Sequence, residues 1–309
     1  MHTLDNLIAS YLENCKIQKQ LDAKTLKAYR IDLQQFSNSC TSDYLEALSP
    51  NYLEQYIGTL HQSYKPRSVK RKIASLKAFC HYLEFRDIIA VNPFHKLQIR
   101  FREPLILPKT IPLHTIEIFI STLYNEQNHA TTLYQKKCIS RDIAVIEILF
   151  ATGMRISEVC HLHLSDINFH DKNIRIWGKG SKERIIQIGN DEVMHAIEYY
   201  YMLFKESIEK SGYFFINRCG NRLSEQSVRD MINKYCASAN ISQHITPHMF
   251  RHSFATLLLE EDVDIRYIQE MLGHSSINVT QIYTHVSMAK QKDILTSKHP
   301  RKNLHFSSK

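Results

Sequence analysis

Thr246-Pro247-His248-Met249-Phe250-Arg251 is the stretch that most constrains the fold and the chemistry of this 309-residue chain. Threonine is favoured immediately before a helix and proline at its first position, so the stretch predicts a helix that begins at Pro247. His248 then lies in the first turn, where backbone N–H groups and the helix dipole attract anions. Arg251 follows three residues later and shares a helix face with His248. The pair suits a phosphate, although the stretch taken alone is better explained by a capped helix with incidental surface residues.

Other residues in the second half of the chain change that balance. Gly153 can end a helix in a left-handed turn, and Arg155, which follows it, has no obvious packing role. Lys179 lies at the tip of a predicted hairpin, from which it can reach a ligand. His274 follows a glycine, and Tyr283 lies nine residues further on. Together these residues favour a phosphate site over incidental surface residues.

The bulk composition is compatible with a nucleic-acid partner. The formal net charge is +8, which suits a polyanion, although many basic proteins bind no nucleic acid. Hydrophobic residues make up 43% of the chain, enough for a packed interior in two domains. The seven cysteines are scattered and form no CxxC pair, which indicates reduced thiols in a cytoplasmic protein. No signal peptide or apolar run of membrane-spanning length is present, so we expect no membrane association.

The N-terminal third is predicted to be helical. Apolar residues recur at helical spacing from Thr25 to Phe36 and from Ser68 to Leu83. The second helix carries a run of cations on its other face. A solvated surface is the usual fate of such a run, but charge of one sign beside a helix start favours a face that contacts DNA. The cations expected to contact DNA are Lys65, Arg67, Lys70, Arg71, Lys72 and Lys77.

Three prolines divide the chain. Pro104, Pro108 and Pro112 recur every four residues, which no helix tolerates. We therefore expect a helical domain at 1–103, an extended linker at 104–112 and a second domain at 113–309.

The second domain is predicted to be mixed. It opens with helices, one of them from about Ser140 to Phe150. Short alternating runs at 174–177 and 184–188 flank a Gly-rich turn and indicate a β-hairpin, against which Trp177 is expected to pack. Helices resume at about Asp191. The chain is thus predicted to be mainly α, with a small antiparallel β-sheet in its C-terminal domain.

The chain resembles the tyrosine recombinase (phage integrase) family. The stretches that carry the resemblance are Ala151-Thr152-Gly153-Met154-Arg155, Gly178-Lys179-Gly180-Ser181-Lys182-Glu183-Arg184, His248-x-x-Arg251, Leu272-Gly273-His274 and Tyr283-Thr284-His285. Each stretch is weak alone, but the ordered set is highly specific. In length and two-domain plan the chain most resembles the Xer recombinases. Its stretch at 125–138 and its C-terminal tail are longer than their counterparts in those proteins.

The resemblance implies a fold and an active site. The fold is a C-shaped clamp around DNA, with a SAM-like helical N-terminal domain and a tyrosine recombinase catalytic domain. The catalytic residues, carried over position by position, are Arg155, Lys179, His248, Arg251, His274 and Tyr283, with Glu158 at a supporting acidic position.

Tyr283 would attack a phosphodiester to give a 3′-phosphotyrosine and a free 5′-hydroxyl. The ester keeps the bond energy, so no ATP is needed to rejoin the strand. An ordinary tyrosine has a pKa of about 10, so the proton must leave during attack, and His248 is the better-placed base.

The other residues would act on the phosphate itself. Arg155 and Arg251 would clamp the non-bridging oxygens as charge builds, and His274 would donate a hydrogen bond. Lys179 would protonate the strongly basic 5′-oxygen as it leaves.

No cofactor or metal is expected. Cys160-His161-x-His163 and the pair His248 and His252 superficially suggest metal ligands, but neither has the zinc-finger or HExxH form.

The resemblance also implies partners. They are double-stranded DNA with an inverted-repeat core site, a dimer on each site, and a homotetramer, or a heterotetramer with a paralogue, at a Holliday junction. The segment 289–309 is expected to dock on a neighbouring subunit. The reaction would serve chromosome dimer resolution or integration and excision of a mobile element. The alternatives are a type IB-like topoisomerase and a non-catalytic DNA-binding regulator of the same fold.

Overall fold

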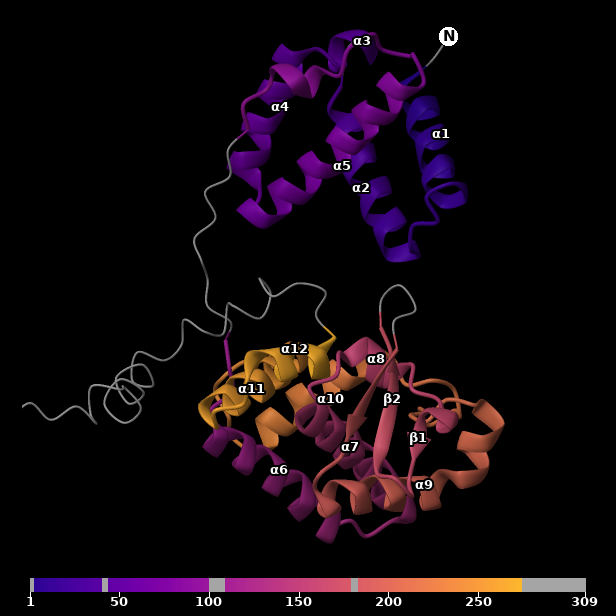
Figure 1. Ribbon diagram of the computed structural model, residues 1–309, viewed down its shortest axis with the longest axis vertical. Helices are drawn as coiled ribbons and strands as arrows, with labels where there is room; N and C mark the ends of the chain where they lie inside the picture. Colours follow the sequence, from indigo (N-terminus) through magenta and orange to yellow (C-terminus); the bar gives the residue numbers. More distant parts are fainter. Residues whose placement is uncertain (1–2, 41–43, 100–108, 179–182, 274–309) are drawn as a thin grey trace, which may run out of the picture. The chain divides into compact units, whose positions relative to one another are not determined.

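A computed structural model describes residues 3–40, 44–99, 109–178 and 183–273. The chain divides into two compact units, residues 1–105 and 106–309, and each is described by itself (Figure 1). Within the described ranges, no helix has the length and apolar character that a membrane crossing requires.

The first unit is a set of helices around one apolar core. Its elements are α1 (Leu4–Ile17), α2 (Ala23–Ser39), α3 (Tyr44–Ala47), α4 (Pro50–Ser63), α5 (Pro66–Phe85) and the 3-10 helix η1 (Pro93–Lys96). α5 packs against α1, α2 and α4. Both predicted helices are confirmed, and they extend to their caps: Asp22 accepts a hydrogen bond at the start of α2, and a proline occupies the first position of α5. The apolar face predicted for α5 is buried throughout: Val69, Ile73, Leu76, Phe79, Cys80 and Leu83.

The second unit contains the remaining helices and a small sheet. Its elements are α6 (Leu113–Asn128), α7 (Leu133–Thr152), α8 (Ile156–Cys160), η2 (Leu164–Asp166), β1 (Ile167–Asn168), β2 (Asn173–Trp177), β3 (Glu183–Gln187), α9 (Asp191–Ser211), α10 (Glu225–Ser238), α11 (Pro247–Glu260) and α12 (Ile265–Leu272). The mainly α architecture with a small antiparallel sheet is therefore confirmed.

α7 is the central helix of this unit. It packs against α6, α9 and α11, and Figure 1 shows it in the interior of the unit. The helix predicted from about Ser140 is confirmed but begins earlier, at Leu133. The reason is a reciprocal cap: Gln135 N–H donates to Thr132 Oγ1 at 3.1 Å, and Thr132 N–H donates to Gln135 Oε1 at 3.2 Å.

The predicted hairpin is formed by β2 and β3. Ile174 pairs with Ile186 in antiparallel register, and both are buried. β1, a strand of two residues that was not predicted, joins the other edge of β2. Trp177 does not pack closely on the hairpin: its side chain is 51% exposed, and its indole N–H donates to Asp166 Oδ1 at 3.2 Å.

The segment expected to be a linker ends inside the second unit. Ile111 is 2% exposed. The backbone N–H of Ile111 donates to the Ser253 hydroxyl at 2.7 Å, and this hydroxyl donates to the Ile111 carbonyl at 3.2 Å. Residues 104–108 lie outside the described residues.

Gly153 ends α7 in the predicted left-handed turn. Its φ is +58°, a region that favours glycine. A Cβ at this position would lie 2.6 Å from Phe254 Cδ1 and 2.8 Å from Leu272 Cδ2. Both the backbone conformation and the close packing of α11 and α12 therefore require glycine here.

We expect Gly153→Ala to destabilise the second unit more than Gly212→Ala. Both glycines end helices with positive φ, but a Cβ at Gly212 meets no atom within 4 Å. Each substitution carries a conformational cost of about 1–2 kcal/mol, and overlap adds about 1–3 kcal/mol at Gly153 alone. Urea unfolding followed by fluorescence of Trp177, the only tryptophan, reports on this unit. Equal losses would contradict the packing argument.

Candidate active site

Arg155 occupies the position immediately before α8, directly after the Gly153 turn. Its Nη1 donates to Glu158 Oε1 at 2.8 Å, and its backbone N–H donates to Glu158 Oε2 at 2.9 Å. The side chain is 35% exposed, so the guanidinium remains open to solvent while one carboxylate orients it.

Glu158 holds a second arginine as well. Arg184 on β3 donates from Nη2 to Glu158 Oε2 at 2.7 Å and from Nη1 to Oε1 at 3.2 Å. Burial alone would raise the pKa of the Glu158 carboxyl, but the hydrogen bonds and charge of Arg184, followed by those of Arg155, hold the pKa below its ordinary value. The carboxylate is therefore ionised at neutral pH.

Arg251 joins two segments that carry predicted site residues. It is 4% exposed. Its Nη1 donates to the Gly153 carbonyl at 2.8 Å and its Nη2 to the Leu272 carbonyl at 2.7 Å. The turn before Arg155 is thereby tied to the end of α12, just before His274.

His248 lies in the first turn of α11, as predicted, and its side chain is exposed. Thr246 occupies the predicted cap position, but its side chain accepts no cap bond, and its carbonyl accepts the Met249 N–H at 2.9 Å. Burial, followed by the charges of His248 and Arg251, lowers the pKa of His252 to about 4. His252 is therefore neutral at pH 7, and it is only partly exposed, whereas His248 is exposed.

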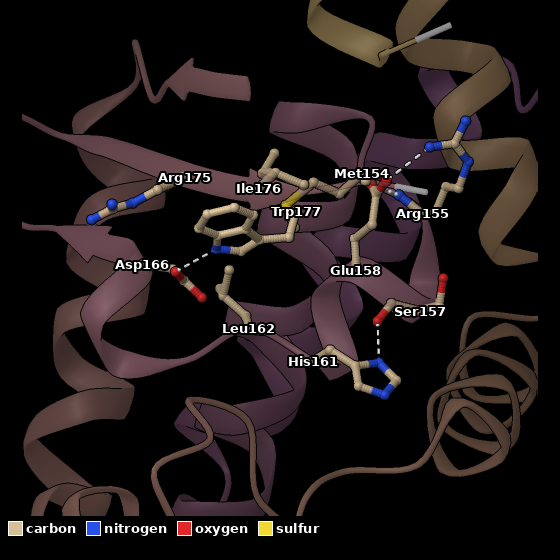
Figure 2. A pocket seen from close by; sticks show the side chains of 11 residues that line it. Met154, Arg155, Ser157, Glu158, His161, Leu162, Asp166, Arg175, Ile176 and Trp177 are labelled. Carbon is tan, nitrogen blue, oxygen red and sulfur yellow. Dashed lines mark hydrogen bonds and ion pairs between the residues drawn. The ribbon is translucent and has the colours of Figure 1, made fainter. Parts of the chain in front are cut away.

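A pocket of about 440 Å³ opens beside Arg155. Figure 2 shows its lining, in which Arg155 and Glu158 lie on one side and Trp177 and Arg175 on the other. Gly178, the residue before Lys179, completes the lining. The pocket thus connects Arg155 with the end of the strand that leads to Lys179.

The described residues bring together part of the predicted site. Arg155, Glu158 and Arg251 are linked through the Gly153 turn, and His248 shares a helix with Arg251. Lys179, His274 and Tyr283 lie outside the described residues, as does the tail 289–309.

Arg184 is the residue that the sequence reasoning missed. It lies in a stretch that carries the family resemblance, but the sequence assigned it no role. The side chain is only 10% exposed.

The predicted DNA-contacting cations of the first unit are not alike. The side chains of Lys65, Arg67, Lys70, Arg71 and Lys77 are exposed. Lys72 is buried, and its Nζ donates to Asp32 Oδ1 at 3.1 Å. For Lys72 the expectation of a DNA-facing side chain is wrong, because Asp32 of α2 neutralises its ammonium inside the unit. Arg71, 46% exposed, also pairs with Asp32.

Histidine and cysteine side chains do not gather around a metal in the described part of the chain, where no group of three or more potential ligands occurs. His161 Nδ1 lies 2.7 Å from the Ser157 carbonyl, and His163 Nδ1 lies 3.0 Å from the Gly212 carbonyl. All seven cysteines are free thiols, and Cys219 is exposed.

Comparison with known proteins covers both units. The phage integrase family matches residues 121–290, and its N-terminal SAM-like domain matches residues 8–87. A tyrosine recombinase of Agathobacter rectalis is 58% identical over 306 residues, which cover 99% of this chain and all of that protein. Tyrosine recombinase XerC of Oceanobacillus iheyensis is 34% identical, over 98% of this chain and 99% of its own.

Solved structures show the same fold. XerH recombinase bound to difH substrate, in a pre-cleavage complex, aligns with a TM-score of 0.71 and 21% identity, over 93% of this chain and 83% of that one. A lambda integrase tetramer bound to a Holliday junction aligns with a TM-score of 0.68 and 15% identity, over 89% of this chain and 78% of that one. The chain therefore belongs to the phage integrase family and is a tyrosine recombinase of the Xer type.

Proposed function

We propose that this protein is a site-specific recombinase that cleaves and rejoins DNA through a 3′-phosphotyrosine at Tyr283. The observation that carries the proposal is the paired arrangement of Arg155 and Arg251. Glu158 orients the first, and the second fastens the turn from which the first projects. Two arginines held in this way support the proposal of a preorganised site for a phosphodiester, which is the group that recombinases of this family attack.

Each site residue has one task in the proposed reaction. Arg155 and Arg251 bind the non-bridging oxygens, and the loss of one such donor typically slows a reaction about 100- to 1,000-fold. His248 accepts the phenol proton as Tyr283 attacks. Lys179 protonates the departing 5′-oxygen, and His274 donates a hydrogen bond to the phosphate. The second half-reaction reverses these transfers, because a 5′-hydroxyl attacks the phosphotyrosine and releases the tyrosine.

The relatives support an assembly on DNA. We propose that the two units close around duplex DNA as a clamp, with a dimer on each inverted-repeat core site. Four subunits then exchange strands through a Holliday junction, as a homotetramer or with a paralogue. Lys65, Arg67, Lys70 and Lys77, all exposed, contact phosphates through the first unit. The protein acts in the cytoplasm, in chromosome dimer resolution or in the integration and excision of a mobile element.

Tyr283→Phe should bind its DNA site but form no covalent adduct. The change removes only the attacking oxygen, so folding is expected to survive. A nicked site that traps the intermediate on a denaturing gel provides the measurement. Tyr267→Phe is the matched control, because Tyr267 is 63% exposed on α12 and should leave the adduct intact. An adduct trapped by the Tyr283 variant would refute the assignment, and relaxed products without strand exchange would indicate a topoisomerase.

Cleavage by the unaltered chain should proceed in EDTA and without ATP. Arg155, Arg251 and Lys179 supply the positive charge that Mg²⁺ supplies in other phosphoryl-transfer enzymes. The rate of adduct formation is compared with and without the chelator. Activity that is lost in EDTA and restored by a divalent ion would contradict this mechanism.

Lys179→Ala should slow cleavage of normal DNA by about 100- to 10,000-fold. The defect should be much smaller on a 5′-bridging phosphorothiolate, because a thiolate leaves without a proton from an acid. Lys172→Ala is the control: Lys172 precedes β2 at the opposite end of the sheet and pairs with Asp191. Equal defects of the Lys179 variant on the two substrates would exclude the general-acid role.

A further inference from the structure

Arg184 connects three separate parts of the second unit. Its side chain starts from β3, the strand that begins four residues after Lys179 in the sequence. Two of its nitrogens donate to Glu158 on α8, and Nε donates to the Met271 carbonyl near the end of α12 at 2.8 Å. Since a guanidinium is a rigid fork, these bonds fix α8, β3 and α12 relative to one another.

The C-terminus of α12 is held by two arginines. The last carbonyls of a helix lack partners within the helix, and the negative end of the helix dipole favours cations. Here Arg184 binds the Met271 carbonyl and Arg251 binds the next one, that of Leu272. Gly273 follows with a φ of +63°, and a Cβ there would lie 3.2 Å from the Cδ and Nη1 atoms of Arg184. A side chain at this position would therefore press on Arg184, in addition to the backbone strain at positive φ.

The charges around Glu158 explain why a second arginine is needed. The Glu158 side chain is 6% exposed and must be paired to remain ionised. With Arg155 as its sole partner it would neutralise that guanidinium. Arg184 binds both carboxylate oxygens, so the cluster of two arginines and one carboxylate keeps a net positive charge. Arg155 is the more exposed of the two, at 35% against 10% for Arg184, so the surplus charge faces the pocket.

We propose that Arg184 is a positioning residue for phosphate cleavage: it holds Glu158 so that Arg155 meets the non-bridging oxygen fully charged and correctly oriented. This inference rests on the proposed function, in which Arg155 binds the scissile phosphate. Arg184 itself does not touch the DNA. Its effect passes through Glu158 to Arg155, and this route distinguishes it from an ordinary buried ion pair.

The test uses DNA with a methylphosphonate at the scissile position. Attack by the tyrosine still expels the 5′-hydroxyl, but a methyl group replaces one non-bridging oxygen and makes the linkage neutral, so the need for an arginine clamp is relieved. Arg184→Gln should slow cleavage of normal DNA on the order of 100-fold, the scale of a misplaced reacting group. On the methylphosphonate its defect should shrink, in parallel with that of Arg155→Ala. The double variant should be no slower than Arg155→Ala alone, because one residue acts through the other.

Two further variants separate positioning from stability. Arg141→Gln removes an arginine of similar burial, 17% exposed, that pairs with Asp142 in α7, and its defect should be the same on both substrates. Arg184→Lys restores the charge without the fork and should recover part of the rate if Arg184→Gln folds poorly. The proposal would be overturned if Arg184→Gln slowed cleavage of normal DNA and of the methylphosphonate by the same factor. It would also be overturned if the 5′-phosphorothiolate, and not the methylphosphonate, reduced the defect. An unaltered chain that forms no adduct would refute the proposed function itself.

Discussion

The buried carboxylate of Glu158 is the interaction on which the candidate site depends. One small anion receives hydrogen bonds from the side chain and backbone of Arg155 and from both terminal nitrogens of Arg184. A buried anion with these partners stays ionised, as the lowered pKa of Glu158 indicates. Removing a partner would leave a buried charge unpaired, which is far more costly than losing a surface ion pair. The cluster is therefore a structural fastening, and in the proposed reaction it also supplies positive charge to the phosphate.

Arg251, like Arg184, fastens segments of the second unit that carry candidate site residues. Arg251 is almost fully buried and binds backbone carbonyls on two segments. These bonds hold the Gly153 turn, from which Arg155 follows, against the last turn of α12. Phosphoryl transfer requires donors that are already in place when charge develops. In the proposed reaction, Arg155 and Arg251 would meet this requirement, because Glu158 and the Gly153 carbonyl already hold their guanidinium groups in place.

Much of this arrangement follows from local rules that a sequence displays. Gly153 ends α7 in a left-handed turn, Pro247 begins α11, and the alternating runs pair as β2 and β3, because each feature depends on neighbouring residues or a short period. The ordered motifs indicated the family before any coordinates. The start of α7 at Leu133 and the strand β1 were missed, since a polar capping box and a two-residue strand leave no hydrophobic periodicity.

The sequence by itself thus indicated the helices at 25–36, 68–83 and from about 140, the hairpin and the family, and the family resemblance named the candidate catalytic residues. Only the tertiary structure decided which cations serve the interior and which face outward. Arg184 and Glu158 are 26 positions apart, Arg251 and Gly153 are 98 apart, and Lys72 and Asp32 are 40 apart. The periodicity of a helix or strand shows which face a cation occupies, but its partner is chosen by packing between elements distant in the chain. For that reason Lys72 resembled a DNA contact and lies inside the first unit, whereas Arg184 was assigned no role and joins Glu158 to α12.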